Sequence, residues 1–229
     1  MLEVRDLNFY IGSAHILRSV SFDVKEGEVV CLLGRNGAGK TSTIKCILGL
    51  YTPRSGKIIF KGRDITRLPP EKRIMLGLAY SPEDARVFPD LTVEENLKLP
   101  VWIRGQTVEM ETIFRIFPEI RKLLKRKGLY LSGGEKKMVS ISRGIALNPS
   151  LLLLDESFEG LAPVAVARFS KALNMIKEMG ITILMAESNI RIAHMLADRI
   201  YVVERGEIIF QGTPDEVMKN EKLLRVIGR

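Results

Sequence analysis

The stretch that decides the fold is GRNGAGKT, at residues 34–41. It fits the phosphate-binding pattern G-x-x-x-x-G-K-S/T, and it stands between an apolar run at residues 29–33 and a helix-like stretch at residues 42–50. A strand, a glycine-rich loop and a helix in this order are the context in which the pattern binds the phosphates of a nucleotide. Taken alone, the loop indicates a nucleoside triphosphatase.

Each residue type in this loop has a physical role. Glycines allow successive backbone N–H groups to curve around an anion, and the start of the following helix adds its positive end. Lys40 is expected to reach the terminal phosphates, and the Thr41 hydroxyl is expected to bind Mg²⁺. The predicted nucleotide-binding residues of the loop are Gly34, Arg35, Asn36, Gly37, Ala38, Gly39, Lys40, Thr41 and Ser42.

Length and composition restrict the class of protein. A chain of 229 residues with 46% hydrophobic and 27% charged residues is long enough for one full core and has the composition of a soluble globular protein. No apolar run approaches the roughly 18 residues that a membrane span needs, and the N-terminus lacks the regions of a signal peptide. Cys31 and Cys46 fit buried thiols in a reducing compartment, so we expect a cytoplasmic location.

The net charge of +8 is unevenly distributed, since residues 115–137 hold eight Lys or Arg and two Asp or Glu. A solvated helical face explains this run, and a face that lies near anionic lipid headgroups is the alternative. The sequence contains no RNA-recognition signature and no zinc-ligand spacing, so we predict no nucleic-acid partner.

Hydrophobic periodicity predicts an α/β protein. Residues 151–154 and 181–185 read as buried strands separated by a helix at 164–179, which is the pattern of a parallel sheet covered on both faces. Residues 92–145 read as a helical insertion because apolar residues recur there at spacings of three and four. The other predicted strands are 2–4, 9–10, 19–24, 55–60 and 78–80, with a hairpin formed by 200–203 and 207–210.

Two further motifs carry chemistry. Asp155 and Glu156 end a run of four leucines, and a carboxylate pair at the tip of a buried strand beside a phosphate loop can hold a metal's hydration shell and activate water. The string LSGGE comprises Leu131, Ser132, Gly133, Gly134 and Glu135. A serine and two glycines that open a helix form an N-cap and a second anion site, which has no obvious target within one chain.

Together, GRNGAGKT, LSGGE and LLLLDE resemble the motifs of an ABC-type ATPase in order and spacing, and the resemblance covers essentially all 229 residues. It implies a P-loop NTPase (RecA-like) core with a parallel sheet, an N-terminal antiparallel β subdomain and an inserted α-helical subdomain. A single domain follows, with residues 1–91 and 146–229 as the core and 92–145 as the helical subdomain. The implied cofactors are ATP and Mg²⁺.

The resemblance also implies roles for single residues. Asp155 binds the metal, Glu156 is the general base that polarises the attacking water, and residues 131–135 contact the γ-phosphate of a nucleotide held by the opposite subunit. The functional unit is then a head-to-tail dimer, formed with a second copy or with a different ABC ATPase subunit.

Several positions depart from the commonest family pattern. Glu83 stands where a glutamine usually reaches Mg²⁺, and Ser188 stands where a histidine usually contacts the γ-phosphate region. Ala162 replaces an aspartate, and Ser157 replaces a proline. The aromatic residue that usually packs on adenine directly precedes the glycine that is Gly12 here. That position holds Ile11, with Tyr10 one residue earlier, and a shift of one residue on a strand turns a side chain to the other face. Which of the two contacts adenine is open at this level.

Glu83, the GLAP string at residues 160–163 and MAESN at residues 185–189 resemble one branch, the ATP-binding subunits of branched-chain amino-acid importers. The resemblance implies transmembrane permease subunits as partners, a substrate-binding protein as an indirect partner, and peripheral attachment to the cytoplasmic face of the cell membrane. We expect Lys40, Glu156 and Ser188 to be catalytic, and Thr41, Asp155 and Glu83 to bind the metal. The alternatives are an exporter of lipid or lipopolysaccharide, a soluble ABC ATPase that acts on nucleic acid or ribosomes, and a catalytically weak regulatory partner.

Overall fold

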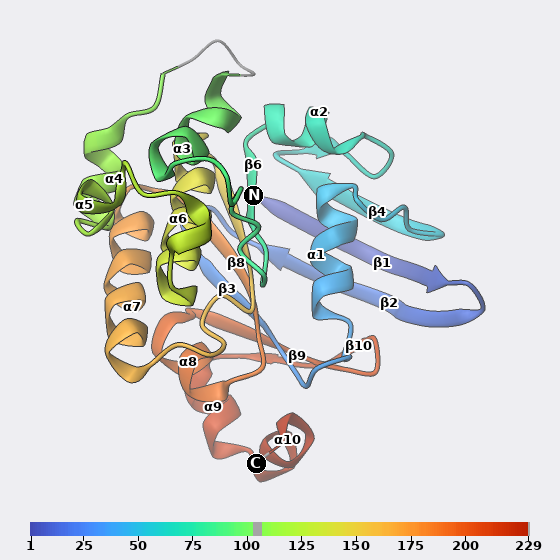
Figure 1. Ribbon diagram of the computed structural model, residues 1–229. Coiled ribbons are helices and arrows are strands. Elements are labelled where there is room, and N and C mark those ends of the chain that lie inside the picture. Colours follow the sequence, from blue (N-terminus) through green and yellow to red (C-terminus); the bar gives the residue numbers. More distant parts are fainter. Residues whose placement is uncertain (103–106, 229) are drawn as a thin grey trace.

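The computed structural model of the protein describes residues 1–102 and 107–228 and contains two sheets (Figure 1). The larger sheet has the strand order β10-β9-β3-β8-β7-β6, in which β9, β3, β8, β7 and β6 run parallel and β10 pairs antiparallel with β9. Its strands are β3 (Val29–Leu33), β6 (Leu78–Ser81), β7 (Leu151–Asp155), β8 (Thr182–Glu187), β9 (Arg199–Glu204) and β10 (Glu207–Gly212). The predicted parallel sheet and C-terminal hairpin are confirmed.

The central strands of this sheet are buried on both faces. Side chains alternate between two hydrophobic clusters, so that Cys31 and Leu154 belong to one cluster while Leu32 and Leu153 belong to the other. This double burial explains why these strands are continuous apolar runs in the sequence. Because these strands are parallel, their carboxyl ends lie at the same edge of the sheet, and the polar residues that follow them meet there.

The smaller sheet is antiparallel and has the order β2-β1-β4-β5. Its strands are β1 (Leu2–Ile11), β2 (Ala14–Val24), β4 (Ser55–Phe60) and β5 (Arg63–Asp64). The prediction of two separate strands at 2–4 and 9–10 was wrong, because one long strand covers both. It contains register shifts and a left-handed residue, Asp6 (φ 46°), which interrupt the alternation that sequence reading relies on. β2 likewise begins earlier than predicted.

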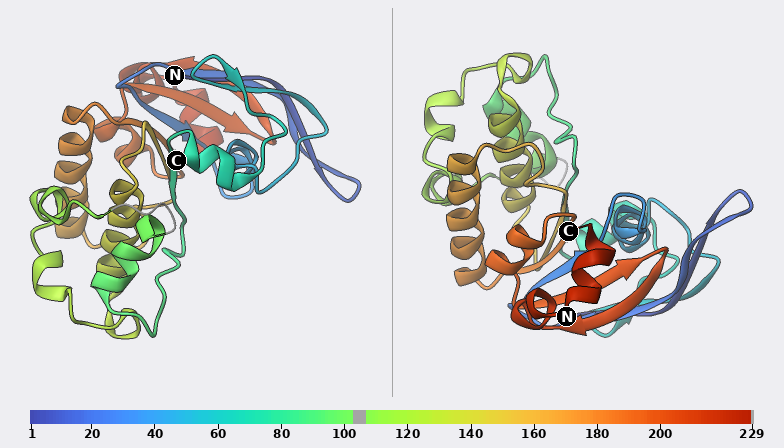
Figure 2. Two further views of the ribbon diagram at one scale, coloured as in Figure 1. Left: turned by 90° about the horizontal axis from the view of Figure 1, so that it is seen from above. Right: turned by 90° about the horizontal axis from the view of Figure 1, so that it is seen from below.

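The described part of residues 92–145 is mainly helical, as predicted; residues 103–106 of that prediction lie outside the described residues. It contains α3 (Val93–Trp102), α4 (Met110–Ile116), α5 (Ile120–Leu123), a 3-10 turn (Gly128–Tyr130) and α6 (Gly133–Ala146). Figures 1 and 2 show these helices on the side of the molecule away from the antiparallel sheet. Apolar residues of these helices share one cluster with Leu152 and Ile183 of the core, so the division into a core and a helical subdomain stays a prediction.

Helix α1 (Lys40–Leu48) lies between the two sheets and carries the phosphate-loop lysine at its first position (Figure 1). It ends at Gly49, which adopts a left-handed conformation (φ 79°). The fully buried Arg73 donates to the carbonyl oxygens of Cys46 and Ile47, and Gly49 N–H also donates to Cys46, so the last turn of the helix is satisfied. This fixes the position of α1, and with it the phosphate loop.

Several short helices were not predicted, because fewer than two full turns are too few to show a helical period in the sequence. They are α2 (Pro70–Met75), α8 (Ile190–Leu196), α9 (Pro214–Lys219) and α10 (Glu221–Ile227). The longest helix, α7 (Pro163–Glu178), matches its prediction closely. Within the described residues, every helix is too short or too polar to cross a lipid bilayer.

Candidate nucleotide-binding and catalytic site

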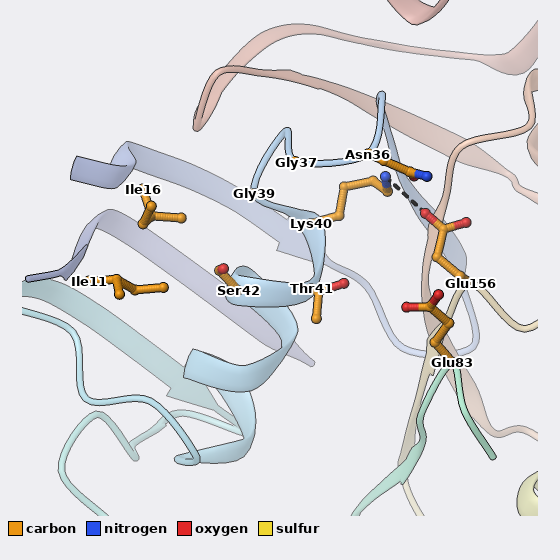
Figure 3. Close-up of a pocket in the computed structure, with 10 residues that line it drawn as sticks. All are labelled: Ile11, Ile16, Asn36, Gly37, Gly39, Lys40, Thr41, Ser42, Glu83 and Glu156. Carbon is orange, nitrogen blue, oxygen red and sulfur yellow. Dashed lines mark ion pairs between the residues drawn. The ribbon is translucent and has the colours of Figure 1, made fainter. Parts of the chain in front are cut away.

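The phosphate loop, α1 and residues of, or directly after, strands β1, β2, β6 and β7 line a cavity of about 440 Å³ (Figure 3). This volume lies within the range typical of small-molecule sites. Nine of the predicted site residues line it, and Ile16 lines it as well. The lining residues are Ile11, Ile16, Asn36, Gly37, Gly39, Lys40, Thr41, Ser42, Glu83 and Glu156.

Two loop glycines are required by geometry. Gly39 has φ +111°, and a Cβ there would lie 2.9 Å from the side chain of Leu17. Gly34 has no positive φ; a Cβ on it would lie 2.3 Å from the carbonyl oxygen of Val203, so close backbone approach excludes any larger residue. The sequence prediction that Gly34 serves backbone conformation is thus corrected to a steric role.

Lys40 and Glu156 form a buried ion pair. The Lys40 Nζ lies 2.9 Å from Glu156 Oε1, and both side chains are about 95% buried (Figure 3). Lys40 also donates to the carbonyl oxygens of Gly34 and Arg35 at 2.7 and 3.1 Å. The lysine that is predicted to bind phosphate is therefore held at the floor of the cavity by the carboxylate that is predicted to activate water.

Glu156 itself has an unusual backbone, with φ 44° in the left-handed region. Such a conformation in a residue with a side chain is uncommon and costs about 1–3 kcal/mol. It turns the Glu156 side chain from the end of β7 towards the phosphate loop. Ser188 holds the other carboxylate oxygen, since its backbone N–H and its hydroxyl both donate to Oε2, at 3.1 and 3.2 Å.

Thr41 and Asp155 provide a pair of oxygen donors beside the phosphate loop. The Thr41 hydroxyl donates to Asp155 Oδ1 at 2.9 Å, and the Tyr80 hydroxyl donates to Oδ2 at 3.2 Å. No cluster of three or more Asp, Glu, His or Cys side chains suited to a metal occurs among the described residues. A hydroxyl and one carboxylate fit Mg²⁺, which keeps several waters and takes further ligands from substrate phosphates.

Burial and nearby acidic groups raise the pKa of two carboxyls at this site, those of Glu83 and Asp155. Glu83 lines the same cavity, and burial together with Glu159, Asp155 and Glu156 holds the pKa of its carboxyl above the ordinary value. Burial also raises the pKa of Asp155, although the hydrogen bonds from Thr41 and Tyr80 oppose that shift. A cation bound between these carboxylates would relieve their repulsion.

Glu187 is a buried acid that sequence reading missed. It ends β8 directly before Ser188 and is 1% exposed, and its Oε1 accepts from the backbone N–H of Phe158 at 3.4 Å. Burial, and to a smaller extent the charge of Glu156, raises the pKa of Glu187 to about 8. Sequence reading missed the buried position of Glu187 because β8 is otherwise apolar, and a charged residue at the end of a buried strand gives no periodic signal.

This shift predicts a pH-dependent stability. A glutamate with the ordinary pKa of 4.5 loses its proton in the unfolded chain, whereas the folded chain retains the proton up to about pH 8. The folded state binds more protons in this window, so stability falls as the pH rises from about 4.5 to 8. Glu187→Gln removes this dependence and is expected to stabilise the chain by roughly 1–3 kcal/mol more at pH 8 than at pH 5. Thermal unfolding at the two pH values measures the difference; an equal gain at both would contradict a buried protonated Glu187.

The signature residues lie outside the cavity. Ser132 caps α6, and a capping box with Glu135 satisfies the first backbone donors of the helix. Ser132 and Gly133 are exposed, and a Cβ on Gly133 would meet no atom within 4 Å, whereas Leu131 is buried and anchors the segment. The capped start of α6 is thus exposed and lies outside the cavity.

Lys137, one turn into α6, connects this segment to the catalytic one. Its ammonium donates to the carbonyl oxygens of Glu156 and Glu159 at 2.9 and 2.8 Å. Partial burial lowers the pKa of Lys137. Sequence reading counted this lysine only as part of a basic run, because nothing in its local pattern shows the distant carbonyls that it binds.

The chain matches a known protein family over more than half of its length. A family model described as ABC transporter matches residues 17–159. The chain belongs to the ABC transporter family. The resemblance stated from the motifs is thereby confirmed, and the chain is an ABC-type ATPase.

Relatives of this ABC protein match it over nearly its full length. The probable branched-chain amino acid transport ATP-binding protein LivF of Archaeoglobus fulgidus is 36% identical over 230 residues, which cover 97% of this chain and 96% of the relative. The lipopolysaccharide export system ATP-binding protein LptB of Haemophilus influenzae is 37% identical over 219 residues, covering 93% and 91%. A solved ATP-binding cassette of an ABC transporter in its ADP conformation superposes with a TM-score of 0.89 at 28% identity, covering 100% and 99%. The predicted fold class is confirmed.

Proposed function

We propose that this chain is the ATP-hydrolysing subunit of an ABC transporter and acts at the cytoplasmic face of a membrane. The observation that carries the proposal is the convergence of Lys40, Thr41 and Glu156 on one cavity, with Asp155 hydrogen-bonded to Thr41 beside it. Phosphoryl transfer needs mainly positioning and charge neutralisation, and these four side chains supply both.

The ion pair suggests the order of events. The γ-phosphate of ATP would take the place of the Glu156 carboxylate beside Lys40, because both are anions that require the same ammonium. Glu156 is then free to accept a proton from the water whose oxygen attacks the γ-phosphorus, while the bond from that phosphorus to the β,γ-bridging oxygen breaks. Mg²⁺, held by Thr41 and Asp155, would neutralise charge on the phosphate oxygens.

The exposed signature segment supports a dimer. Residues 132–135 open α6 outside the cavity of the phosphate loop, and the N-terminus of a helix favours an anion. In a head-to-tail pair, each signature segment would face the nucleotide of the other subunit. The partner would be a second copy or a different ABC ATPase subunit.

An ATPase assay tests the proposed function. We expect the purified chain to release phosphate from ATP in the presence of Mg²⁺ and to lose this activity in EDTA. Phosphate release that is unaffected by EDTA, or the absence of ATP binding with Mg²⁺ present, would contradict the proposal.

Ser188 predicts a slow enzyme when two copies pair. Its hydroxyl donates to Glu156 at 3.2 Å, and it has a shorter reach than histidine and no cationic form to stabilise the γ-phosphate. Ser188→His is expected to raise steady-state turnover several-fold, and mixing the wild type with a histidine-bearing partner subunit should do the same. Turnover is measured as phosphate release at saturating ATP. An unchanged rate in the variant would refute this account of Ser188.

For the substrate, we propose branched-chain or other amino acids, moved inwards by permease subunits that receive this chain. The likeness to LivF and the strings around Glu83 and Ser188 support this choice, while the likeness to LptB supports lipopolysaccharide-type export as the second candidate. Residues 81–91 and the helices after them would form the surface for the permease. Reconstitution with the permeases encoded beside this chain separates the two, since leucine uptake that depends on ATP would exclude the exporter.

A further inference from the structure

The residue that we propose as the water-activating base stands on a short, irregular segment of the chain. Residues 156–159 follow the end of β7 and precede α7, which begins at Pro163. Glu156 has a left-handed backbone (φ 44°), a conformation that a residue with a side chain keeps only where the surrounding structure holds it. The contacts of this segment therefore decide where the Glu156 carboxylate points (Figure 3).

Lys137 holds the segment from helix α6. Its ammonium donates to the carbonyl oxygen of Glu156 at 2.9 Å and to that of Glu159 at 2.8 Å. The backbone N–H of Glu159 also donates to the Glu156 carbonyl, at 3.2 Å, so the two carbonyls stand at the two ends of one turn. An ammonium has three N–H donors and no acceptor, and it can therefore join both carbonyls at once.

Glu187 holds the same segment from the end of β8. Its buried carboxylate accepts through Oε1 from the backbone N–H of Phe158 at 3.4 Å. Its backbone carbonyl accepts from the N–H of Gly34, the first residue of the phosphate loop, at 3.2 Å. Glu187 thus contacts both the loop that carries Lys40 and the segment that carries Glu156.

Lys137 and Glu187 also support each other electrostatically. Burial lowers the pKa of Lys137, and among the charges that oppose this shift the largest effect comes from Glu187. Burial raises the pKa of Glu187, and the charge of Lys137 opposes that shift in turn. Neither side chain is among those that line the nucleotide cavity, so any effect on catalysis has to pass through the segment that they hold.

Building on the proposed ATPase function, we propose that Lys137 and Glu187 are positioning residues that fix residues 156–159 and hold the Glu156 carboxylate where it can accept a proton from the attacking water. They act through the backbone of the segment and do not touch the nucleotide. Catalysis depends strongly on such support, since a displacement of a reacting group by about 1 Å can cost roughly 100-fold in rate. Loss of either contact should therefore lower kcat and leave ATP binding unchanged.

Single variants test the two contacts. Lys137→Met and Glu187→Leu remove the hydrogen bonds but keep side chains of similar size, and each is expected to lower kcat about tenfold while the KM and the dissociation constant for ATP stay within about twofold. Glu187→Gln keeps an acceptor oxygen for the N–H of Phe158 and should recover most of the rate that Glu187→Leu loses. Steady-state phosphate release gives kcat and KM, calorimetry gives the affinity, and circular dichroism checks the folding.

The matched control is Lys136→Met. Lys136 precedes Lys137 on the same helix and takes no part in these hydrogen bonds, so its loss should leave kcat within about twofold of the wild type. A tenfold loss in this control would show that any lysine removed from this turn of α6 slows the enzyme, and it would overturn the specific role of Lys137.

Double variants show whether the two residues act through Glu156. In the Glu156→Gln background the base is already absent, so adding Lys137→Met or Glu187→Leu should change the residual rate, measured in single turnovers, by less than about twofold. A further tenfold loss in that background would overturn the proposal, because the effect would then not pass through the base.

The outcomes separate this proposal from the proposed function. If the wild type hydrolyses ATP and Lys137→Met keeps kcat within about twofold, or loses ATP affinity as much as rate, the positioning role falls and the ATPase proposal stands. Lys137 is only partly buried, so Lys137→Met decides the matter even where Glu187→Leu fails to fold. If the wild type neither binds nor hydrolyses ATP with Mg²⁺ present, the ATPase proposal falls, and the positioning role with it.

Discussion

Glu156→Gln is expected to reduce ATP hydrolysis by at least about 100-fold, since a positioned general base contributes roughly 10²–10⁴ to the rate. ATP binding should persist and become tighter. The glutamine has no negative charge to compete with phosphate for Lys40, whose ammonium lies 2.9 Å from the Glu156 carboxylate. Phosphate release gives the rate, and calorimetry gives the affinity. Without hydrolysis, the ATP-bound dimer should accumulate, which sedimentation velocity detects.

Glu159→Gln is the matched control. Glu159 lies three residues further along the same loop and is exposed, so the same change of charge there should leave hydrolysis within about twofold of the wild type. Hydrolysis at near the wild-type rate in Glu156→Gln would exclude Glu156 as the base. Weaker ATP binding in that variant would show that its carboxylate does not compete with the phosphates.

Lys40→Met is expected to have two effects of similar importance. Nucleotide binding should be weakened by about 100-fold or more, because the ammonium is the cation predicted to meet the terminal phosphates. The free energy of unfolding should also fall by about 2–4 kcal/mol, since the variant leaves the Glu156 carboxylate buried without its counter-ion. In a chain of this size that corresponds to a lower melting temperature, by roughly 5–12 °C.

The control for Lys40→Met is Lys45→Met, which removes a lysine from the same helix where it lies near the Tyr51 ring instead of the cavity. Combining Lys40→Met with Glu156→Gln closes a double-mutant cycle. We expect Glu156→Gln to restore part of the free energy of unfolding that Lys40→Met removes, because the glutamine carries no uncompensated charge. Strictly additive effects on stability would contradict a coupled pair.

The sequence predicted those parts of the site whose chemistry is local. The phosphate loop, the carboxylate pair and the capped signature helix are each encoded within a few consecutive residues, and the buried strands are visible as apolar runs. The features of the site that the sequence could not predict are contacts between residues far apart in the chain. The steric need for Gly34 comes from Val203, and the role of Lys137 comes from carbonyls about twenty residues away.

Strand geometry was the other gap in the sequence-based prediction. Alternation along β1 could state that Tyr10 and Ile11 face opposite ways, but the register shifts within the strand left open which of them faces the nucleotide cavity. Helices α2, α8, α9 and α10 were missed because six or seven residues are too few to establish a helical period.

The ammonium of Lys137 has a consequence for communication between two active sites. It lies in α6, the helix whose first turn would meet the partner's nucleotide, and it holds the backbone of the segment that carries this chain's own Glu156. In the proposed dimer, a ligand that displaces α6 in one site therefore also displaces the water-activating residue of the other. Binding of ATP at one site would then affect hydrolysis at the other, so turnover should depend cooperatively on ATP concentration.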